Sequence, residues 1–117
     1  QVTDQGAREG NYLESSATAL FIYTLAKAIN KGYIGNEYIE PTQKAFDGMV
    51  KTFTRLEEDG SYTITNCCAV AGLGGDSKRY RDGSFEYYIS EPIIENDPKS
   101  VGSFILAAIE YEKMTKK

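Results

Sequence analysis

The sequence predicts a mainly α-helical fold with about three long helices and a small β-hairpin. Apolar residues recur at spacings of three and four in three separate segments, which is typical of helices with a buried face. A short alternating segment and a glycine-rich stretch lie between the second helix and the third. With 117 residues, of which 41% are hydrophobic and 26% charged, the chain has the composition of one globular domain at most.

The first helix is expected to begin at about Tyr12 and to end at Gly32, because glycine readily adopts the left-handed conformation that ends helices. Its apolar positions are Leu13, Ala17, Leu20, Phe21, Thr24, Leu25, Ala28 and Ile29. After Glu14 its only charges are Lys27 and Lys31. A helix with so few charges is predicted to be buried on more than one face.

The second helix is expected to begin at about Pro41, whose fixed φ suits a first helical turn. Its apolar stripe consists of Ala45, Phe46, Met49, Val50, Phe53 and Leu56, and the opposite face is charged. Asp59 and Gly60 then predict a turn, and residues 61–65 alternate as a short strand. Residues 84–89 are predicted to be the partner strand of this hairpin.

The third helix has the clearest start, because Asp97 is a natural N-cap and Pro98 suits the first helical position. Its apolar stripe consists of Val101, Phe104, Ile105, Ala108, Ile109 and Met114. Lys113, Lys116 and Lys117 form a basic tail that complements the helix C-terminus.

Two amphipathic helices cannot cover a helix that is apolar on nearly all sides. We therefore expect residues 1–117 to be a single partial domain, with residues 1–11 as a lead-in loop. The missing cover would come from more of the same chain or from another subunit. The chain starts at Gln1 without an initiator methionine or signal peptide, and we interpret it as a processed product, an excised piece or a fragment of something longer.

Several function classes are excluded by what the sequence lacks. A net charge of −4, with no basic cluster beyond the C-terminal lysines, argues against nucleic-acid binding. No apolar stretch approaches the roughly 20 residues that span a membrane. The absence of histidine excludes a Ser-His-Asp triad and a histidine-ligated zinc site within this chain, so acid–base chemistry would fall to Asp, Glu, Tyr or Lys. Cys67 and Cys68 are adjacent, which favours two buried thiols over a strained disulfide.

The segment 80–92 combines aromatic rings, carboxylates, an arginine and hydroxyls, a mixture that suits a surface binding a polar ring such as a sugar. The same composition also fits an exposed edge strand with half-buried tyrosines. The loop 67–75 is rich in glycine but lacks the Lys-Ser/Thr of a phosphate loop, so we interpret it as a permissive loop.

Five carboxylates are candidates for acid–base roles: Glu14, Asp82, Glu86, Glu91 and Asp97. Asp97 has a structural explanation as a cap, and a negative charge at Glu14 is favourable in a first helical turn. Glu86 and Glu91 have no such local explanation. Ser15 and Ser16, at the start of the first helix, can hydrogen-bond a ligand or cap the backbone.

Several separated motifs resemble one family in order and spacing from about residue 10 to residue 112. The motifs are NYLESSATALF at 11–21, CAVAGLGG at 68–75, YRDGSFEYY at 80–88, NDPK at 96–99 and the glycine at 102. They resemble the C-terminal part of the unsaturated rhamnogalacturonyl hydrolases of glycoside hydrolase family 105, which are related to the unsaturated glucuronyl hydrolases of family 88.

The resemblance implies the C-terminal portion of an (α/α)6 barrel, in which inner and outer helices alternate around a central pocket. It implies removal of a 4,5-unsaturated uronic acid from pectin-derived oligosaccharides, without metal or organic cofactor. In that family an aspartic acid protonates the double bond, water adds, and the hemiketal rearranges to release the sugar. The catalytic aspartate is expected upstream of this chain, so the chain alone should be inactive. Five residues are carried over as candidate substrate-binding positions: Ser16, Tyr87, Tyr88, Ser90 and Glu91.

Two alternatives stay open at this point. The chain could be a non-catalytic helical module that binds carbohydrate or self-associates. Whether this chain binds unsaturated uronides without upstream residues distinguishes such a module from a fragment of the hydrolase. It could also be a free-standing enzyme that uses Glu86 and Glu91 as a carboxylate pair, which requires the two carboxyl groups to lie roughly 5–10 Å apart across a sugar.

Overall fold

The computed structural model describes residues 1–76 and 80–116 and confirms a mainly helical fold with small antiparallel strand pairs. Lys117, part of the predicted basic tail, lies outside the described residues. The elements in chain order are α1 (Ser15–Lys31), a 3₁₀ turn η1 (Asn36–Tyr38), α2 (Ile39–Phe53), β1 (Thr54–Leu56), β2 (Tyr62–Ile64), β3 (Cys67–Cys68), α3 (Phe85–Ser90), β4 (Ile93–Ile94) and α4 (Pro98–Thr115).

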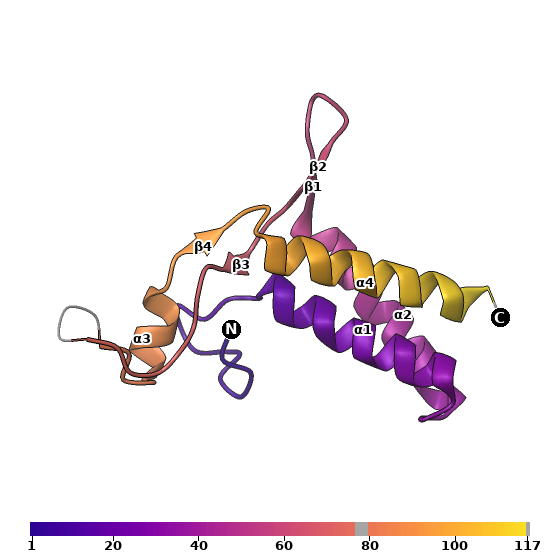
Figure 1. Ribbon diagram of the computed structural model, residues 1–117, viewed down its shortest axis with the longest axis horizontal. Helices are drawn as coiled ribbons and strands as arrows, with labels where there is room; N and C mark the ends of the chain where they lie inside the picture. The colour runs from indigo at the N-terminus through magenta and orange to yellow at the C-terminus, as the bar shows by residue number, and fades with distance from the viewer. Residues whose placement is uncertain (77–79, 117) are drawn as a thin grey trace.

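The three long helices pack against one another in a compact group (Figure 1). Helices α1 and α4 lie side by side and run in the same direction, whereas α2 returns in the opposite direction. The described parts of the long connection, residues 54–76 and 80–97, lie at the end where α1 and α4 begin, and the β1–β2 hairpin projects away from the helices (Figure 1). Because α1 and α4 are parallel and α2 is antiparallel to both, the N-terminal ends of α1 and α4 lie beside the same loops.

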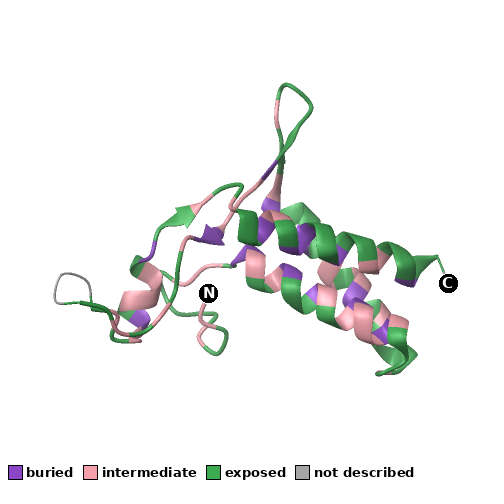
Figure 2. Ribbon diagram, in the orientation of Figure 1, coloured by how far each residue is buried: buried purple, intermediate pink, exposed green. Residues whose placement is uncertain are grey.

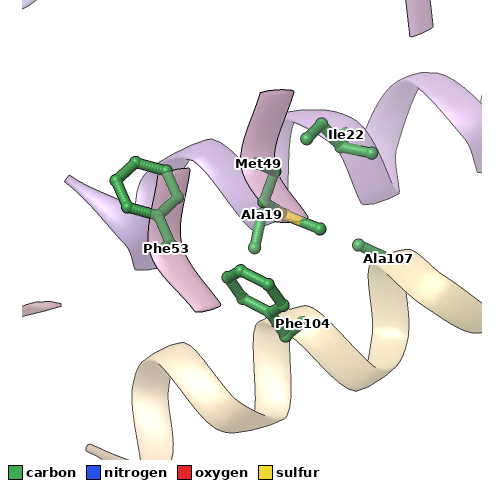
Figure 3. Close-up of a cluster of buried hydrophobic side chains, with 6 residues drawn as sticks. All are labelled: Ala19, Ile22, Met49, Phe53, Phe104 and Ala107. Carbon is green, nitrogen blue, oxygen red and sulfur yellow. The ribbon is translucent and has the colours of Figure 1, made fainter. Parts of the chain in front are cut away.

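The main core lies where the three helices meet (Figure 3). Its buried side chains are Ala19, Ile22, Met49, Phe53, Phe104 and Ala107. The alanines on α1 and α4 allow these two helices to approach closely, and the larger side chains of α2 fill the space beside them. Farther along the helices, Phe46 of α2 stacks on Tyr111 of α4 with ring centroids 3.8 Å apart.

The predicted end of α1 and start of α4 are confirmed, whereas the starts of α1 and α2 shift by two or three residues. Gly32 ends α1 with a φ of 71°, and its N–H donates to the carbonyl oxygens of Ala28 and Ile29. Asp97 caps α4 by accepting a hydrogen bond from the Lys99 N–H, and Pro98 occupies the first turn. Helix α1 begins three residues after Tyr12, because Glu14 is still extended and caps it. Helix α2 begins two residues before Pro41.

The predicted strand over residues 84–89 is wrong, because these residues form α3. The hydroxyl of Ser84 accepts a hydrogen bond from the Tyr87 N–H and caps this short helix. The partner of β2 is instead β1, which pairs with it in antiparallel register from Thr54↔Ile64 to Leu56↔Tyr62. The turn at Asp59 and Gly60, with a Gly60 φ of 83°, joins these two strands directly.

The end of the second predicted stripe also differs from the expectation. Leu56 lies on β1 after α2 has ended at Phe53, and its side chain is 62% exposed. The chain therefore enters the β1–β2 hairpin after Phe53 instead of continuing the helix to Leu56.

Each of α1 and α4 leaves an apolar face uncovered (Figure 2). On α1, Leu20 and Phe21 are 46% and 61% exposed. On α4 the predicted stripe divides, because Phe104 and Met114 are buried whereas Ile105 and Ile109 are 55% and 45% exposed. We call the exposed residues Leu20, Phe21, Ile105, Ala108 and Ile109 the open apolar face.

Within the described part of the chain, no helix combines the length and apolarity that crossing a membrane requires.

Candidate functional site

Two adjacent hollows lie beside the start of α1. The first has a volume of about 330 Å³ and lies between the segment before α1 and the first two turns of that helix. Its walls include Asn11, Tyr12, Glu14, Thr18 and Phe21. The second has a volume of about 280 Å³ and is bounded by Ala71 and Tyr88 on one side. Both hollows share the chain segment 1–3 as a wall, so they form neighbouring parts of one region.

Glu14 is the buried acid of this region, with 8% of its surface exposed. Its Oε2 accepts a hydrogen bond from the Ala17 N–H at 2.8 Å, and its Oε1 accepts from the Cys68 N–H at 3.0 Å and from the Ser16 N–H at 3.2 Å. Burial by itself would raise the pKa of the Glu14 carboxyl, but these hydrogen bonds outweigh it and hold the pKa below its ordinary value. Glu14 is therefore an anionic cap that ties α1 to β3.

Ser16 donates its hydroxyl hydrogen to Glu14 Oε1 at 2.8 Å. It is half-buried and does not belong to the walls of either hollow. Its hydroxyl therefore supports the Glu14 cap rather than binding the backbone itself, and a contact with substrate stays a prediction.

Tyr87 and Glu91 form a second polar centre at the far side of the site. The Tyr87 hydroxyl donates to Glu91 Oε1 at 2.6 Å and accepts a hydrogen bond from the Gly72 N–H at 3.2 Å. Arg81 Nε lies 3.5 Å from the same carboxylate oxygen. Burial, followed by the hydrogen bond to Glu91, raises the pKa of Tyr87.

Tyr88 and Ser90 complete the predicted set. Tyr88 forms part of the second hollow, and its ring lies against that of Tyr87 with centroids 4.9 Å apart and planes tilted by 52°. Ser90 is exposed, and its hydroxyl donates to the Tyr87 carbonyl oxygen at 2.6 Å. Of the five predicted binding residues, only Tyr88 is itself a wall of one of the two hollows.

Glu86 and Glu91 occupy different environments. Glu86 is exposed and forms an ion pair with Arg8 at 2.5 Å, and the Arg8 guanidinium also lies 3.8 Å from the centroid of the Phe85 ring. Glu91 is 2% exposed and does not line either hollow. This arrangement gives no support to a free-standing carboxylate pair built from these two residues.

Asp82 and Asp97 have local structural roles. Asp82 accepts a hydrogen bond from the Ser84 N–H at 2.9 Å, and Asp97 caps α4 beside the Lys99 ammonium group at 2.7 Å. Hydrogen bonds from Ser84 lower the pKa of Asp82, and hydrogen bonds from Lys99 lower the pKa of Asp97.

The two cysteines are free and buried, as predicted. Burial raises the pKa of the Cys67 thiol, which keeps it protonated. The described residues contain no group of three or more acidic or cysteine side chains placed to hold a metal ion.

The sequence interpretation missed the contribution of the segment before α1. Residues 1–11 were expected as a lead-in loop, yet Val2, Thr3 and Asn11 supply walls of the hollows. The Asn11 side chain holds this segment, because its Nδ2 donates to the carbonyl oxygens of Val2 and Gln5 at 2.8 and 2.9 Å. The only sequence signal was the position of Asn11 and Tyr12 at the start of the first motif.

Parallel helices α1 and α4, backed by an antiparallel α2 and topped by long loops at one end, are the arrangement of one section of a helical barrel. The sequence model of Glycosyl Hydrolase Family 88 matches residues 1–115. The chain therefore belongs to this family.

Solved structures agree with this assignment. The chain superimposes on a Clostridium acetobutylicum ATCC 824 glycoside hydrolase from family 105 with a TM-score of 0.92 and 46% identity, over 96% of this chain and 31% of that one. A possible family 105 member from Klebsiella pneumoniae gives a TM-score of 0.66 at 27% identity, over 94% of this chain and 25% of that one. The fold is thus a fragment of a family 105 helical barrel.

Two curated relatives match at 37% identity over 114 residues: Protein Atu3128 of Agrobacterium fabrum and the 24.9 kDa protein in picA locus of Rhizobium radiobacter. The match covers 94% of this chain and 49% of each relative, so the chain spans about half their length.

Proposed function

We propose that the whole protein containing this chain removes a 4,5-unsaturated uronic acid from pectin-derived, rhamnogalacturonan-type oligosaccharides. The observation that carries the proposal is family membership over residues 1–115, together with 46% identity and a TM-score of 0.92 to a family 105 glycoside hydrolase. The reaction is hydration of the double bond: an aspartic acid upstream of this chain protonates it, water adds, and the hemiketal rearranges to release the shortened oligosaccharide.

This chain would supply part of the wall of the substrate pocket. An aromatic face such as that of Tyr88 suits stacking against a sugar ring, and the polar groups around the two hollows suit its hydroxyls. Ser16, Tyr87, Ser90 and Glu91 are proposed as substrate-side or supporting positions around this wall.

We also propose that the remaining helices of the same barrel cover the open apolar face. Exposed isoleucines and a phenylalanine on two adjacent helices are costly in water, and the chain accounts for only 31% of the family 105 structure it matches. The barrel helices that this chain lacks are therefore the partner that fits the face.

The reaction is tested with the full-length protein and an oligosaccharide that ends in a 4,5-unsaturated uronic acid. Loss of the double bond's ultraviolet absorbance, together with release of the shortened sugar, is the expected result. The control is the same oligosaccharide with a saturated terminal uronic acid, which hydration cannot process. Equal release from both substrates would contradict the hydration mechanism, and release from neither would contradict the proposed activity.

A second candidate function is a non-catalytic module that self-associates through the open apolar face or binds carbohydrate. It predicts that the full-length protein binds unsaturated uronides without consuming them. Binding by calorimetry with unchanged ultraviolet absorbance would support this module over the hydrolase.

A further inference from the structure

Among the described residues only Glu14 and Glu91 carry buried acidic side chains. The burial of Glu14 is explained by its role as the cap of α1. Glu91 caps no helix start, since it follows the last residue of α3. A carboxylate buried at this position needs partners that compensate for the loss of water, and those partners define its role.

The contacts of Glu91 connect two segments that are distant along the chain. Its Oε1 accepts the Tyr87 hydroxyl hydrogen at 2.6 Å, and the same hydroxyl oxygen accepts the N–H of Gly72 at 3.2 Å. Arg81 Nε lies 3.5 Å from the same oxygen of Glu91. The backbone of Arg81 exchanges two hydrogen bonds of 2.8 Å with Gly74. The carboxylate therefore holds Gly72 against α3 through the Tyr87 hydroxyl, and it holds Arg81 there through the Arg81 side chain.

The backbone at Glu91 is itself fixed from behind. The next residue, Pro92, accepts a hydrogen bond from the Ala69 N–H at 2.9 Å, and β4 pairs with β3 in the register Cys67↔Ile94. Backbone hydrogen bonds thus hold the main chain next to Glu91, so the carboxylate can act as a fixed point for Gly72 and Arg81.

The segments held in this way are walls of the second hollow. Ala71 precedes Gly72 and Tyr88 follows Tyr87, and both line that hollow of about 280 Å³. Moving the hydroxyl of Tyr87 away from Gly72 would separate these two walls.

We propose that Glu91 is a positioning residue of the candidate site: its buried carboxylate orients the Tyr87 hydroxyl, which in turn fixes Gly72 and sets the spacing between Ala71 and Tyr88. Glu91 acts from behind the wall rather than by touching the substrate. Its effect on turnover rests on the proposed function, whereas its effect on the position of Gly72 does not.

The first test is amide hydrogen exchange in the full-length protein. Tyr87→Phe removes the acceptor of the Gly72 N–H, and Glu91→Ala removes the anchor of Tyr87. Each should speed exchange at Gly72 by about tenfold, since one net hydrogen bond of about 1.4 kcal/mol corresponds to that factor. Glu91→Gln keeps an oxygen that accepts from Tyr87 and should restore most of the protection.

The matched control is Glu86→Ala, which removes an exposed carboxylate from the same short helix and should leave Gly72 unchanged. The double variant Tyr87→Phe with Glu91→Ala should exchange no faster at Gly72 than the faster single variant, because both act through one chain of contacts. Additive effects, unchanged exchange at Gly72, or equal acceleration throughout α1 and α4 would overturn the proposal. If Glu91→Ala does not fold, Tyr87→Phe and Glu91→Gln decide the question.

The second test is steady-state kinetics on the unsaturated oligosaccharide. Glu91→Ala and Tyr87→Phe should raise KM several-fold with little change in kcat, and Glu91→Gln should restore KM. A fall in kcat with unchanged KM would overturn the positioning role. Absence of turnover by the unsubstituted protein would instead reject the proposed function, and the exchange data would still decide the role of Glu91.

Discussion

Glu14 shows how a single acidic residue can join two elements at once. Its carboxylate accepts backbone hydrogen bonds from both the first turn of α1 and from Cys68 of β3. The helical part of this role could be predicted from the sequence, because a negative charge is favourable at a helix start. The bond to Cys68 could not, because 54 residues separate the two partners.

Glu14→Gln should lower the free energy of unfolding by about 1–3 kcal/mol near neutral pH. The cause is that each carboxylate oxygen faces N–H donors, so the amide nitrogen of glutamine must oppose one of them. Urea denaturation of the full-length protein measures this difference, with the exposed Glu9→Gln as a control that should change little.

The pH dependence of this difference follows from the lowered pKa of Glu14. A carboxyl with a lowered folded-state pKa stabilises the fold fully above its unfolded-state pKa of about 4.3, and this contribution is lost as pH falls through the folded-state value. The gap between the unsubstituted protein and Glu14→Gln should therefore shrink below about pH 4. A gap that stays constant down to about pH 2 would contradict the anionic cap.

At the level of elements, the end of α1 and the start of α4 follow local chemistry. Gly32 and Asp97 are recognised from the sequence because each acts within one helical turn of its own position. Helix α3 was missed although Ser84 is a good N-cap, because the aromatic and branched residues that follow favour a strand.

Two glycine substitutions on these helices should have opposite effects. Gly32→Ala should destabilise the protein by about 1 kcal/mol, because a φ of 71° is unfavourable for a residue with a Cβ. Gly48→Ala, in the interior of α2 where an added Cβ meets no atom within 4 Å, should stabilise it by about 1 kcal/mol. Thermal unfolding of both variants gives the comparison, and the same sign for both would contradict the helix assignment.

At the level of the whole molecule, the open apolar face is the feature that bears on the proposed partner of this chain. The face combines apolar residues of α1 and α4 that are exposed in the described part of the chain (Figure 2). The expectation that a nearly all-apolar first helix needs more partners than α2 and α4 stays a prediction.

Ile105→Ala measures whether this face is covered in the full-length protein. A covered isoleucine should cost about 2–4 kcal/mol of unfolding free energy, whereas an exposed one should cost less than about 0.5 kcal/mol. Leu56→Ala on the projecting hairpin is the matched control, since Leu56 is exposed to a similar degree. Equal and small effects of both substitutions would show that the face stays open to solvent.

The three long helices, the cap residues Gly32 and Asp97, the two buried thiols and the family could be predicted from the sequence, because these depend on periodicity, on residues within one turn and on ordered motifs. Three features became known only from the folded structure: β1 is the partner of β2, Glu91 is buried but lines neither hollow, and the segment before α1 forms walls of the site. These features depend on contacts between residues far apart in the chain. Whether a carboxylate is buried or a strand is paired is settled by which distant groups can satisfy its hydrogen bonds, and a local pattern does not contain that information.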